Sequence, residues 1–170
     1  MLVFALSIAV GILVWVGYNL IGEIGGAAFV PTGQKEIDRV LAKLNLKPGK
    51  KFYDLGSGDG RVVRTAVEKF GVKGVGVELN PWLVWWSNLK NCHPNLQFVR
   101  KDFWKMDLSD ADYIYFYQSP RAAKRLGKKM NKEGKSGLII ISKAFEIRDG
   151  NIERKRTVVI ENRSYFIYQT

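Results

Sequence analysis

The chain has 170 residues, of which 46% are hydrophobic, so it can bury the core of one ordinary domain and is not a disordered polymer. Its 27 Lys and Arg residues against 16 Asp and Glu give a formal net charge of +11. This charge favours an anionic partner: nucleic acid, an anionic membrane face or an acidic protein. A single cysteine excludes an internal disulfide, and a single histidine argues against a metal centre built on histidine.

The first 21 residues contain no charge. As a helix they would span roughly 30 Å, the thickness of the hydrocarbon core of a bilayer. A cleaved signal peptide would call for a basic start and a shorter apolar run, and a buried core helix is a third alternative. We therefore expect an uncleaved transmembrane anchor over residues 1–21. Basic residues follow this segment and none precedes it, which predicts a single-pass membrane protein whose folded domain faces the cytoplasm.

Residues 22–32 form a short linker, and residues 33–170 show the pattern of one folded domain. Thr32 is positioned to cap a helix with apolar residues at helical spacing. Strands and helices then alternate, and two final strands meet at a turn near 162–163. This order predicts an α/β domain with a mostly parallel sheet and an antiparallel edge. The predicted strands cover 51–56, 74–80, 96–102, 111–118, 136–145 and the hairpin within 153–170, and the predicted helices cover 61–70, 81–90 and 121–132.

The segment YDLGSGDGR, residues 53–61, puts a glycine at every second position directly after the first strand. Ligands of such sheets bind beyond the carboxyl ends of the strands, where the strand order reverses. A dinucleotide fingerprint would need its last glycine at position 61, where Arg61 stands. Asp54 and Asp59 would also repel a pyrophosphate. They suit S-adenosylmethionine, which carries an ammonium and a sulfonium group, while the glycines let the backbone come close.

Two further acids end the next two strands. Glu78 lies 22 positions beyond Gly56, where an acid accepts both ribose hydroxyls, and Asp102 is placed to receive an adenine amino group, with Phe103 beside it. Any one of these acids is equally well explained as a solvated strand end. Three acids at three successive strand ends are a much more specific signal of a cofactor site.

Several segments together resemble a known family. The segment DLGSGDGR resembles motif I of class I S-adenosylmethionine-dependent methyltransferases. With FVPT, GVELNPWLV and RKDFWKMDLS it resembles the small membrane-anchored protein-lysine methyltransferases, which include the enzymes acting on the adenine nucleotide translocase and on the c-subunit of ATP synthase. The resemblance covers about residues 28–145. It implies a seven-stranded, Rossmann-like methyltransferase sheet preceded by one transmembrane helix, and a pre-motif, matched by Phe29, Pro31 and Thr32, that caps the cofactor.

The predicted cofactor-binding residues combine the acids, the glycine loop and the matched motifs. They are Thr32, Asp54, Gly56, Ser57, Gly58, Asp59, Glu78, Leu79, Asn80, Asp102 and Phe103. No metal is expected.

The acceptor side is predicted at the loop after the fourth strand, where Tyr117 and Gln118 are the candidate catalytic residues. A lysine acceptor must lose a proton from a pKa of about 10.4, and an apolar channel favours the neutral amine. Trp82, Trp104, Tyr115 and Tyr117 are candidates to line this channel, and Asp107 and Tyr117 are candidate bases. Trp85 and Trp86 are expected to pack on the sheet. Adenine methylation is a rival reaction, but Gln118-Ser119-Pro120 does not match the motif typical of those enzymes.

The predicted helix at 121–132 carries a continuous basic stripe. A solvated surface, an anionic membrane and nucleic acid are the alternatives, and the anchor favours the membrane over nucleic acid. We expect a methyltransferase acting on a lysine of a membrane protein. The rival hypotheses are a lipid-headgroup or small-amine methyltransferase, and a non-catalytic basic membrane-surface module with this fold. The stripe consists of Arg121, Lys124, Arg125, Lys128, Lys129 and Lys132.

Overall fold

The computed structural model describes residues 6–12, 30–148 and 152–170, and it divides the chain into two units, Met1–Val30 and Pro31–Thr170. Residues 6–12 are helical and exposed. The remainder of the predicted anchor, and the linker up to residue 29, lie outside the described residues. Within the described ranges, no helix is both long enough and apolar enough to cross a membrane.

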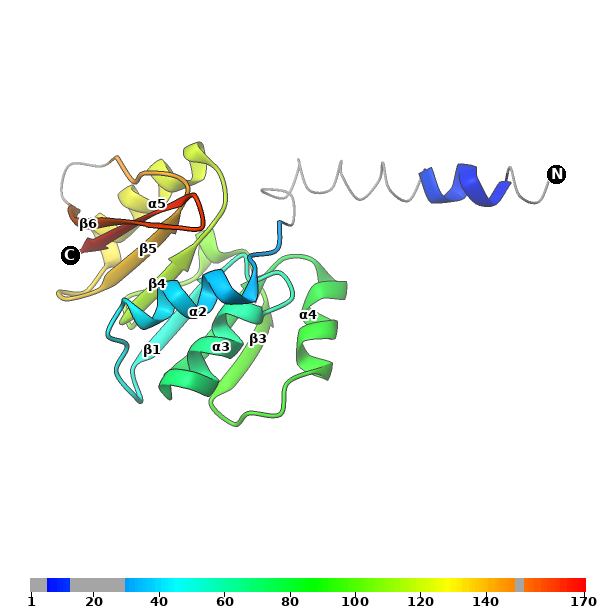
Figure 1. Cartoon of the computed structure of the whole chain (residues 1–170), viewed down its shortest axis with the longest axis horizontal. Helices are drawn as coiled ribbons and strands as arrows, with labels where there is room; N and C mark the ends of the chain where they lie inside the picture. Colours follow the sequence, from blue (N-terminus) through cyan, green and yellow to red (C-terminus); the bar gives the residue numbers. More distant parts are fainter. Residues whose placement is uncertain (1–5, 13–29, 149–151) are drawn as a thin grey trace. The chain divides into compact units, whose positions relative to one another are not determined.

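The second unit is built on a seven-stranded sheet with the order β3-β2-β1-β4-β5-β7-β6 (Figure 1). The first five strands are parallel, while β7 runs antiparallel to both β5 and β6. This confirms the predicted parallel sheet with an antiparallel edge. The strands are β1 (Lys51–Leu55), β2 (Lys73–Glu78), β3 (Leu96–Arg100), β4 (Tyr113–Phe116), β5 (Ile139–Lys143), β6 (Glu153–Ile160) and β7 (Arg163–Gln169).

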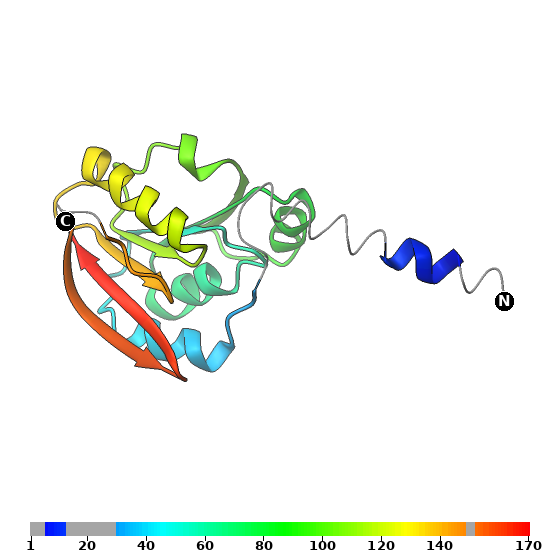
Figure 2. The same ribbon diagram turned by 90° about the horizontal axis from the view of Figure 1, so that it is seen from above.

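Helices cover both faces of the sheet. Figure 2 shows α5 on one face and α2 and α3 on the other, and the buried side chains form two apolar clusters, one on each face. Thr32 is not the cap of α2 as predicted: Gly33 holds the N-cap position without a side-chain hydrogen bond. The helices are α2 (Gln34–Ala42), α3 (Arg61–Phe70), α4 (Pro81–Leu89) and α5 (Pro120–Glu133), with a 3₁₀ turn η1 (Phe103–Lys105).

The strand order reverses at β1, which pairs with β2 on one side and with β4 on the other. Leu55, the last residue of β1, is in register with Val77 and with Phe116. The segments that follow β1, β2 and β4 therefore leave the same edge of the sheet side by side. This is the place where open α/β sheets bind their ligands.

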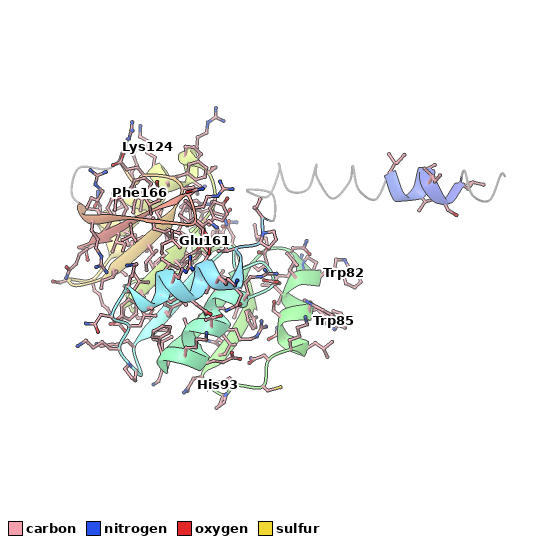
Figure 3. All side chains as sticks on the ribbon, viewed as in Figure 1. Trp82, Trp85, His93, Lys124, Glu161 and Phe166 are labelled. Atoms are coloured by element: carbon pink, nitrogen blue, oxygen red, sulfur yellow. The ribbon has the colours of Figure 1, made fainter. Side chains whose placement is uncertain are left out.

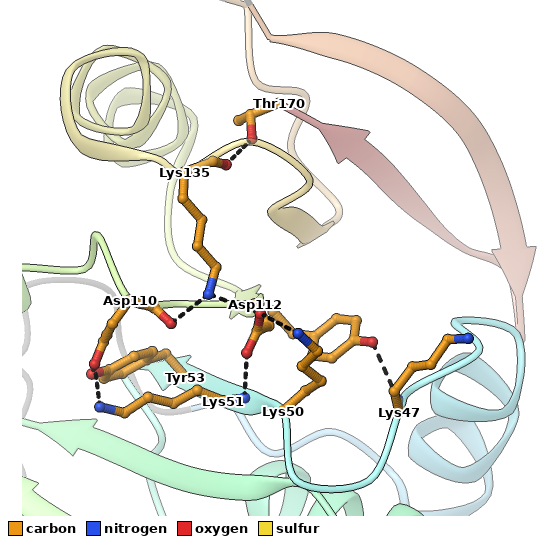
Figure 4. Close-up of polar contacts among 9 residues, drawn as sticks. Lys47, Lys50, Lys51, Tyr53, Asp110, Asp112, Lys135 and Thr170 are labelled. Carbon is orange, nitrogen blue, oxygen red and sulfur yellow. Dashed lines mark hydrogen bonds and ion pairs between the residues drawn. The ribbon is translucent and has the colours of Figure 1, made fainter.

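At the opposite end of the sheet, where β1 and β4 begin, ion pairs and hydrogen bonds connect neighbouring segments (Figure 4). Asp112 accepts a hydrogen bond from the backbone N–H of Lys51 at 2.8 Å and forms an ion pair with Lys135 at 2.8 Å. Asp110 pairs with Lys51 and accepts from the hydroxyl of Tyr53 at 3.0 Å. These contacts connect the amino ends of β1 and β4 to the segment before β5. The acids used here lie at the end of the sheet away from the predicted site.

The tryptophans of α4 do not pack on the sheet. Trp85 is 57% exposed and Trp86 is 43% exposed, so the prediction that these two rings face the core is wrong. In Figure 3 the labelled Trp82 and Trp85 project from the outer side of α4. The inward side of the helix is formed by Ser87, which is fully buried, and by Val84, which packs against the core.

Candidate active site

The glycine loop connects β1 to α3 and is folded over the end of β2. The N–H groups of Gly56 and Ser57 both donate to the carbonyl oxygen of Val77, at 2.8 and 3.0 Å. Gly56, Gly58 and Gly60 all have positive φ angles, of 83°, 56° and 76°. Residues with a side chain adopt this conformation at a cost, which explains the glycines at alternate positions.

The loop also lies close to the side chain of Gln118, in the segment after β4. A Cβ atom on Gly56 would lie 1.8 Å from Nε2 of Gln118. The Gln118 amide in turn donates to the carbonyl oxygen of Leu55 at 3.2 Å. The structure therefore brings the predicted acceptor residue Gln118 directly against the predicted cofactor loop.

Glu78 organises the second side of the site. Its Oε2 accepts from the N–H of Gly58 at 3.0 Å, and its Oε1 accepts from the N–H groups of Leu79 and Asn80 at 2.8 and 2.9 Å. One carboxylate thus fixes the glycine loop to the start of α4, where Asn80 caps the helix through Trp82 N–H at 2.9 Å. Oε1 thereby uses both of its lone pairs, whereas Oε2 keeps one lone pair for a further donor such as a ribose hydroxyl.

Asp54 is buried beside this carboxylate. It is 3% exposed, and its Oδ2 has no hydrogen-bond partner among the described residues. Burial, and then the nearby carboxylates of Glu78 and Asp59, raise the pKa of Asp54 to about 8. Ser57 Oγ, also buried, has no partner among the described residues either. These atoms leave a negatively polarised position that a cationic ligand group would stabilise.

Asp59 is engaged within the chain. Its carboxylate accepts hydrogen bonds from Nε of Arg61 at 2.9 Å and forms an ion pair with Nη2 at 2.6 Å. Burial alone would raise the pKa of Asp59, but the hydrogen bonds from Arg61 hold it below its usual value. The same guanidinium donates to the carbonyl oxygen of Thr32 at 3.1 Å. The pair therefore connects the pre-motif to the glycine loop, and a direct contact of Asp59 with the cofactor stays a prediction.

Asp102 and Phe103 stand at the next strand end, as predicted. The N–H of Lys101 donates to the carbonyl oxygen of Glu78 at 3.2 Å, so β3 keeps its pairing with β2 up to this point. Asp102 Oδ1 accepts from the N–H of Trp104 at 3.0 Å and begins η1. Phe103 is 8% exposed, with its ring centroid 4.6 Å from that of Trp104. The backbone thus fixes the place of Asp102 relative to Glu78.

A buried polar cluster was not predicted from the sequence. Lys143, 3% exposed at the end of β5, forms an ion pair with Glu36 at 3.0 Å and donates to Oγ1 of Thr32 at 3.1 Å. The hydroxyl of Tyr165 donates to Glu36 at 2.7 Å. Lys143 Nζ also lies 4.6 Å from the ring centroid of Tyr117. This cluster fixes Thr32 and the ring of Tyr117 beside the site, and the charge of Lys143 inside an apolar strand was its only sequence signal.

The aromatic residues predicted to line an acceptor channel are not brought together. Tyr115 is 2% exposed and belongs to the core, whereas Trp82 is 75% exposed on the outside of α4. The ring of Trp104 is covered by the guanidinium of Arg125, 4.2 Å from the ring centroid. Asp107 binds the N–H of Ser109 at 2.9 Å, and this hydrogen bond holds the pKa of Asp107 low, which argues against a role as base. Among these candidates, Tyr117 alone lies next to Gln118 at the site.

The basic stripe of α5 is exposed except at one position. Lys129 turns inward, where Nζ donates to the carbonyl oxygen of Met106 at 2.6 Å and pairs with Glu133. The other five basic residues are exposed at the surface of α5.

The chain is similar to known proteins. Residues 54–154 match the model of the ANTKMT methyltransferase domain. The chain is 36% identical to the human lysine N-methyltransferase of the ATP synthase c-subunit over 121 residues, 69% of this chain and 51% of that protein. It therefore spans about half the length of that relative. It is 32% identical to a protein-lysine N-methyltransferase of Saccharolobus islandicus over 146 residues, 82% of this chain and 90% of that protein.

A solved structure shows a similar fold with a ligand present. An RNA methyltransferase from Salinibacter ruber, crystallised with S-adenosyl-L-homocysteine, superimposes with a TM-score of 0.74 and 30% identity, covering 82% of this chain and 93% of that one. The Asp54 oxygen without a partner among the described residues, the carboxylate of Glu78 and the positive-φ glycine loop fit a cofactor with a cationic amino acid part and a ribose. The chain belongs to the ANTKMT methyltransferase domain family, and S-adenosylmethionine is its cofactor.

Proposed function

We propose that the chain is a protein-lysine N-methyltransferase that transfers the methyl group of S-adenosylmethionine to the ε-amino group of a lysine. The observation that carries this proposal is the buried Asp54, whose Oδ2 has no hydrogen-bond partner among the described residues, next to Glu78 where the strand order reverses. The S. islandicus protein-lysine N-methyltransferase supports the lysine acceptor, because the match spans most of both chains.

The residues of the site bind and orient rather than react. The bound cofactor supplies a methyl group activated by a sulfonium. Asp54 and Glu78 set a negative potential that favours the ammonium end and the ribose, and the glycine loop holds them at fixed positions. Methyl transfer needs the nucleophile in line with the methyl group, so positioning is the main contribution of the protein.

The acceptor side is assigned to Tyr117 and Gln118. Gln118 is held against Leu55 and Gly56, and Tyr117 is half-buried with Lys143 over its ring. In this proposal, Gln118 orients the acceptor nitrogen and the ring of Tyr117 flanks it.

The substrate is proposed to be a membrane protein. The human relative is named for its action on the ATP synthase c-subunit. In this proposal the uncharged residues 1–21 are a retained membrane anchor, and the folded domain lies on the cytoplasmic side. The exposed basic residues of α5 are proposed to dock on an anionic membrane surface.

Transfer of radiolabelled methyl groups to isolated membranes tests the acceptor. We expect label in protein, recovered as methyllysine after hydrolysis. Glu78→Ala should abolish both cofactor binding and transfer, while Glu68→Ala, which removes an exposed acid of α3, should change neither. Gln118→Ala should keep cofactor binding and lose transfer, and Gln97→Ala on β3 serves as its control.

A second candidate is methylation of RNA, favoured by the similarity to the S. ruber RNA methyltransferase and by the net charge of +11. With total RNA added to the same reaction, label in RNA and none in protein would replace the lysine proposal with this one. Label only in the lipid extract would instead indicate a headgroup acceptor. Cofactor binding without methyl transfer to protein, RNA or lipid would indicate the non-catalytic module.

A further inference from the structure

The outer side of α4 is an apolar face built from tryptophan. Trp82, Trp85, Trp86 and Leu89 are 75%, 57%, 43% and 62% exposed, at the i, i+3, i+4, i+7 spacing of one helix face. Leu79, 41% exposed, leads into it. We call these five residues the tryptophan face. Between Pro31 and Thr170, Val159 is the only other exposed large apolar side chain among the described residues.

The tryptophan face is ordered and uncharged. The rings of Trp82 and Trp85 meet edge to face at 6.5 Å between centroids, and the ring of Trp86 lies 6.5 Å from that of Trp85. No residue from Pro81 to Leu89 carries a charge. A contiguous exposed apolar patch of this kind marks a binding surface.

The residues around the face are basic. Lys90 stacks on Trp86, with Nζ 4.1 Å from the ring centroid. Arg100 is exposed and donates to the carbonyl oxygen of Leu79 at 3.3 Å, and the exposed Lys101 follows it. The nearest acid along the chain, Glu78, is turned inward and is occupied by three backbone N–H groups. An apolar centre with a cationic rim complements the acyl chains and phosphates of an anionic bilayer.

We propose that the tryptophan face docks into the headgroup region of a lipid bilayer. Tryptophan prefers this region because its ring is apolar and its N–H is polar. Leu79 and Asn80 join the face directly to Glu78, so docking here holds the cofactor site next to the bilayer surface. The basic stripe of α5 covers the other side of the sheet, so docking through the tryptophan face is an alternative to docking through α5, and it does not depend on methyl transfer.

Tryptophan fluorescence of the full chain on vesicles tests the proposal. The chain has five tryptophans, so Trp15→Phe with Trp104→Phe leaves those of α4 as the only reporters. The vesicles contain phosphatidylcholine and phosphatidylserine, with or without bromine on the acyl chains. We expect the emission to shift to shorter wavelength on ordinary vesicles and to be quenched on brominated ones. Circular dichroism and cofactor binding verify that the variant is folded.

A matched control carries its reporter away from the face. Val159, 67% exposed on β6, is replaced by Val159→Trp in a chain whose five tryptophans are phenylalanine. This reporter should stay unshifted and unquenched on the same vesicles. If the α4 reporters of the vesicle-bound chain also stay unshifted and open to acrylamide, the proposal is wrong. It is equally wrong if their emission is already shifted without lipid and insensitive to bromine, because a protein segment or a second copy then covers the face. Neither result touches the methyltransferase proposal.

Discussion

Asp54 makes cofactor binding depend on pH. Burial and the neighbouring carboxylates raise the pKa of Asp54 to about 8, so this carboxyl group is mostly protonated at neutral pH before the cofactor binds. The cation of S-adenosylmethionine favours the ionised form. Binding should therefore release a proton, and the affinity should fall as the pH is lowered.

The magnitude follows from the titration. Below a pKa of about 8, the ionised fraction of Asp54 falls about tenfold for each pH unit, which corresponds to about 1.4 kcal/mol. From pH 7.0 to pH 5.5 the dissociation constant should rise about thirtyfold. The amino group of the cofactor stays protonated over this range, so it adds no slope.

Isothermal titration calorimetry in buffers of different ionisation enthalpy measures both the affinity and the proton release. In Asp54→Asn the carboxyl group is replaced by an amide of the same shape, and we expect weaker binding with no such slope. Equal slopes in the two proteins, or binding without proton release, would refute the assignment of the titration to Asp54.

The raised pKa of Asp54 also predicts how the stability of the cofactor-free protein changes with pH. Its folded pKa lies above the unfolded value of about 3.9, so the folded state holds a proton that the unfolded state has lost between these two values. The contribution of Asp54 to the free energy of unfolding is full below pH 4 and is lost as the pH rises towards 8. Urea unfolding of the cofactor-free protein at pH 5 and pH 8 should show this loss, and Asp54→Asn should not.

Two further predictions concern the scaffold of the site. Gly60→Ala should lower the free energy of unfolding by about 2–4 kcal/mol, because φ is 76° and the new Cβ would lie 2.2 Å from the ring of Phe98. Gly49→Ala is the control: φ is also 76°, but no atom lies within 4 Å of the new Cβ, so the loss should be only about 1–2 kcal/mol. Equal losses in urea unfolding would contradict the steric argument. Lys143→Met should cost about 3–5 kcal/mol by leaving the buried Glu36 charge uncompensated, and adding Glu36→Gln should restore part of that loss in the same assay.

The parts of the fold that depend on local signals were predictable from the sequence. Helix α3 runs from Arg61 to Phe70, as predicted, because Gly60 and Gly71 stand at its two ends with φ of 76° and 67°. The acids at the ends of β1, β2 and β3 were predicted to meet because parallel strands end at a common edge, and Asp54 and Glu78 are close enough to shift a pKa.

The parts that depend on distant contacts were not predictable. Lys143 is separated by 111 residues from Thr32 and by 107 from Glu36, so no local pattern indicates that they form one buried cluster. The pairing of Asp59 with Arg61 was missed for another reason. Asp59 and Arg61 are always close in the sequence, but residues two apart do not generally direct their side chains at each other. Here Gly60, between them, adopts the αL conformation, and the Arg61 guanidinium turns back onto the Asp59 carboxylate.

The orientation of α4 shows why periodicity alone gave the wrong face. An apolar i, i+3, i+4, i+7 stripe indicates which residues share a side of a helix, and the usual inference is that this side faces the core. In α4 the inward side must fit against the glycine loop: Ser87 Oγ donates to the carbonyl oxygen of Gly58 at 3.4 Å and would lie 3.3 Å from a Cβ on Gly60. A tryptophan has no room there. The close approach that the cofactor loop requires therefore selects a small side chain inside and leaves the large rings outside, so the loop and the tryptophan face have one physical cause.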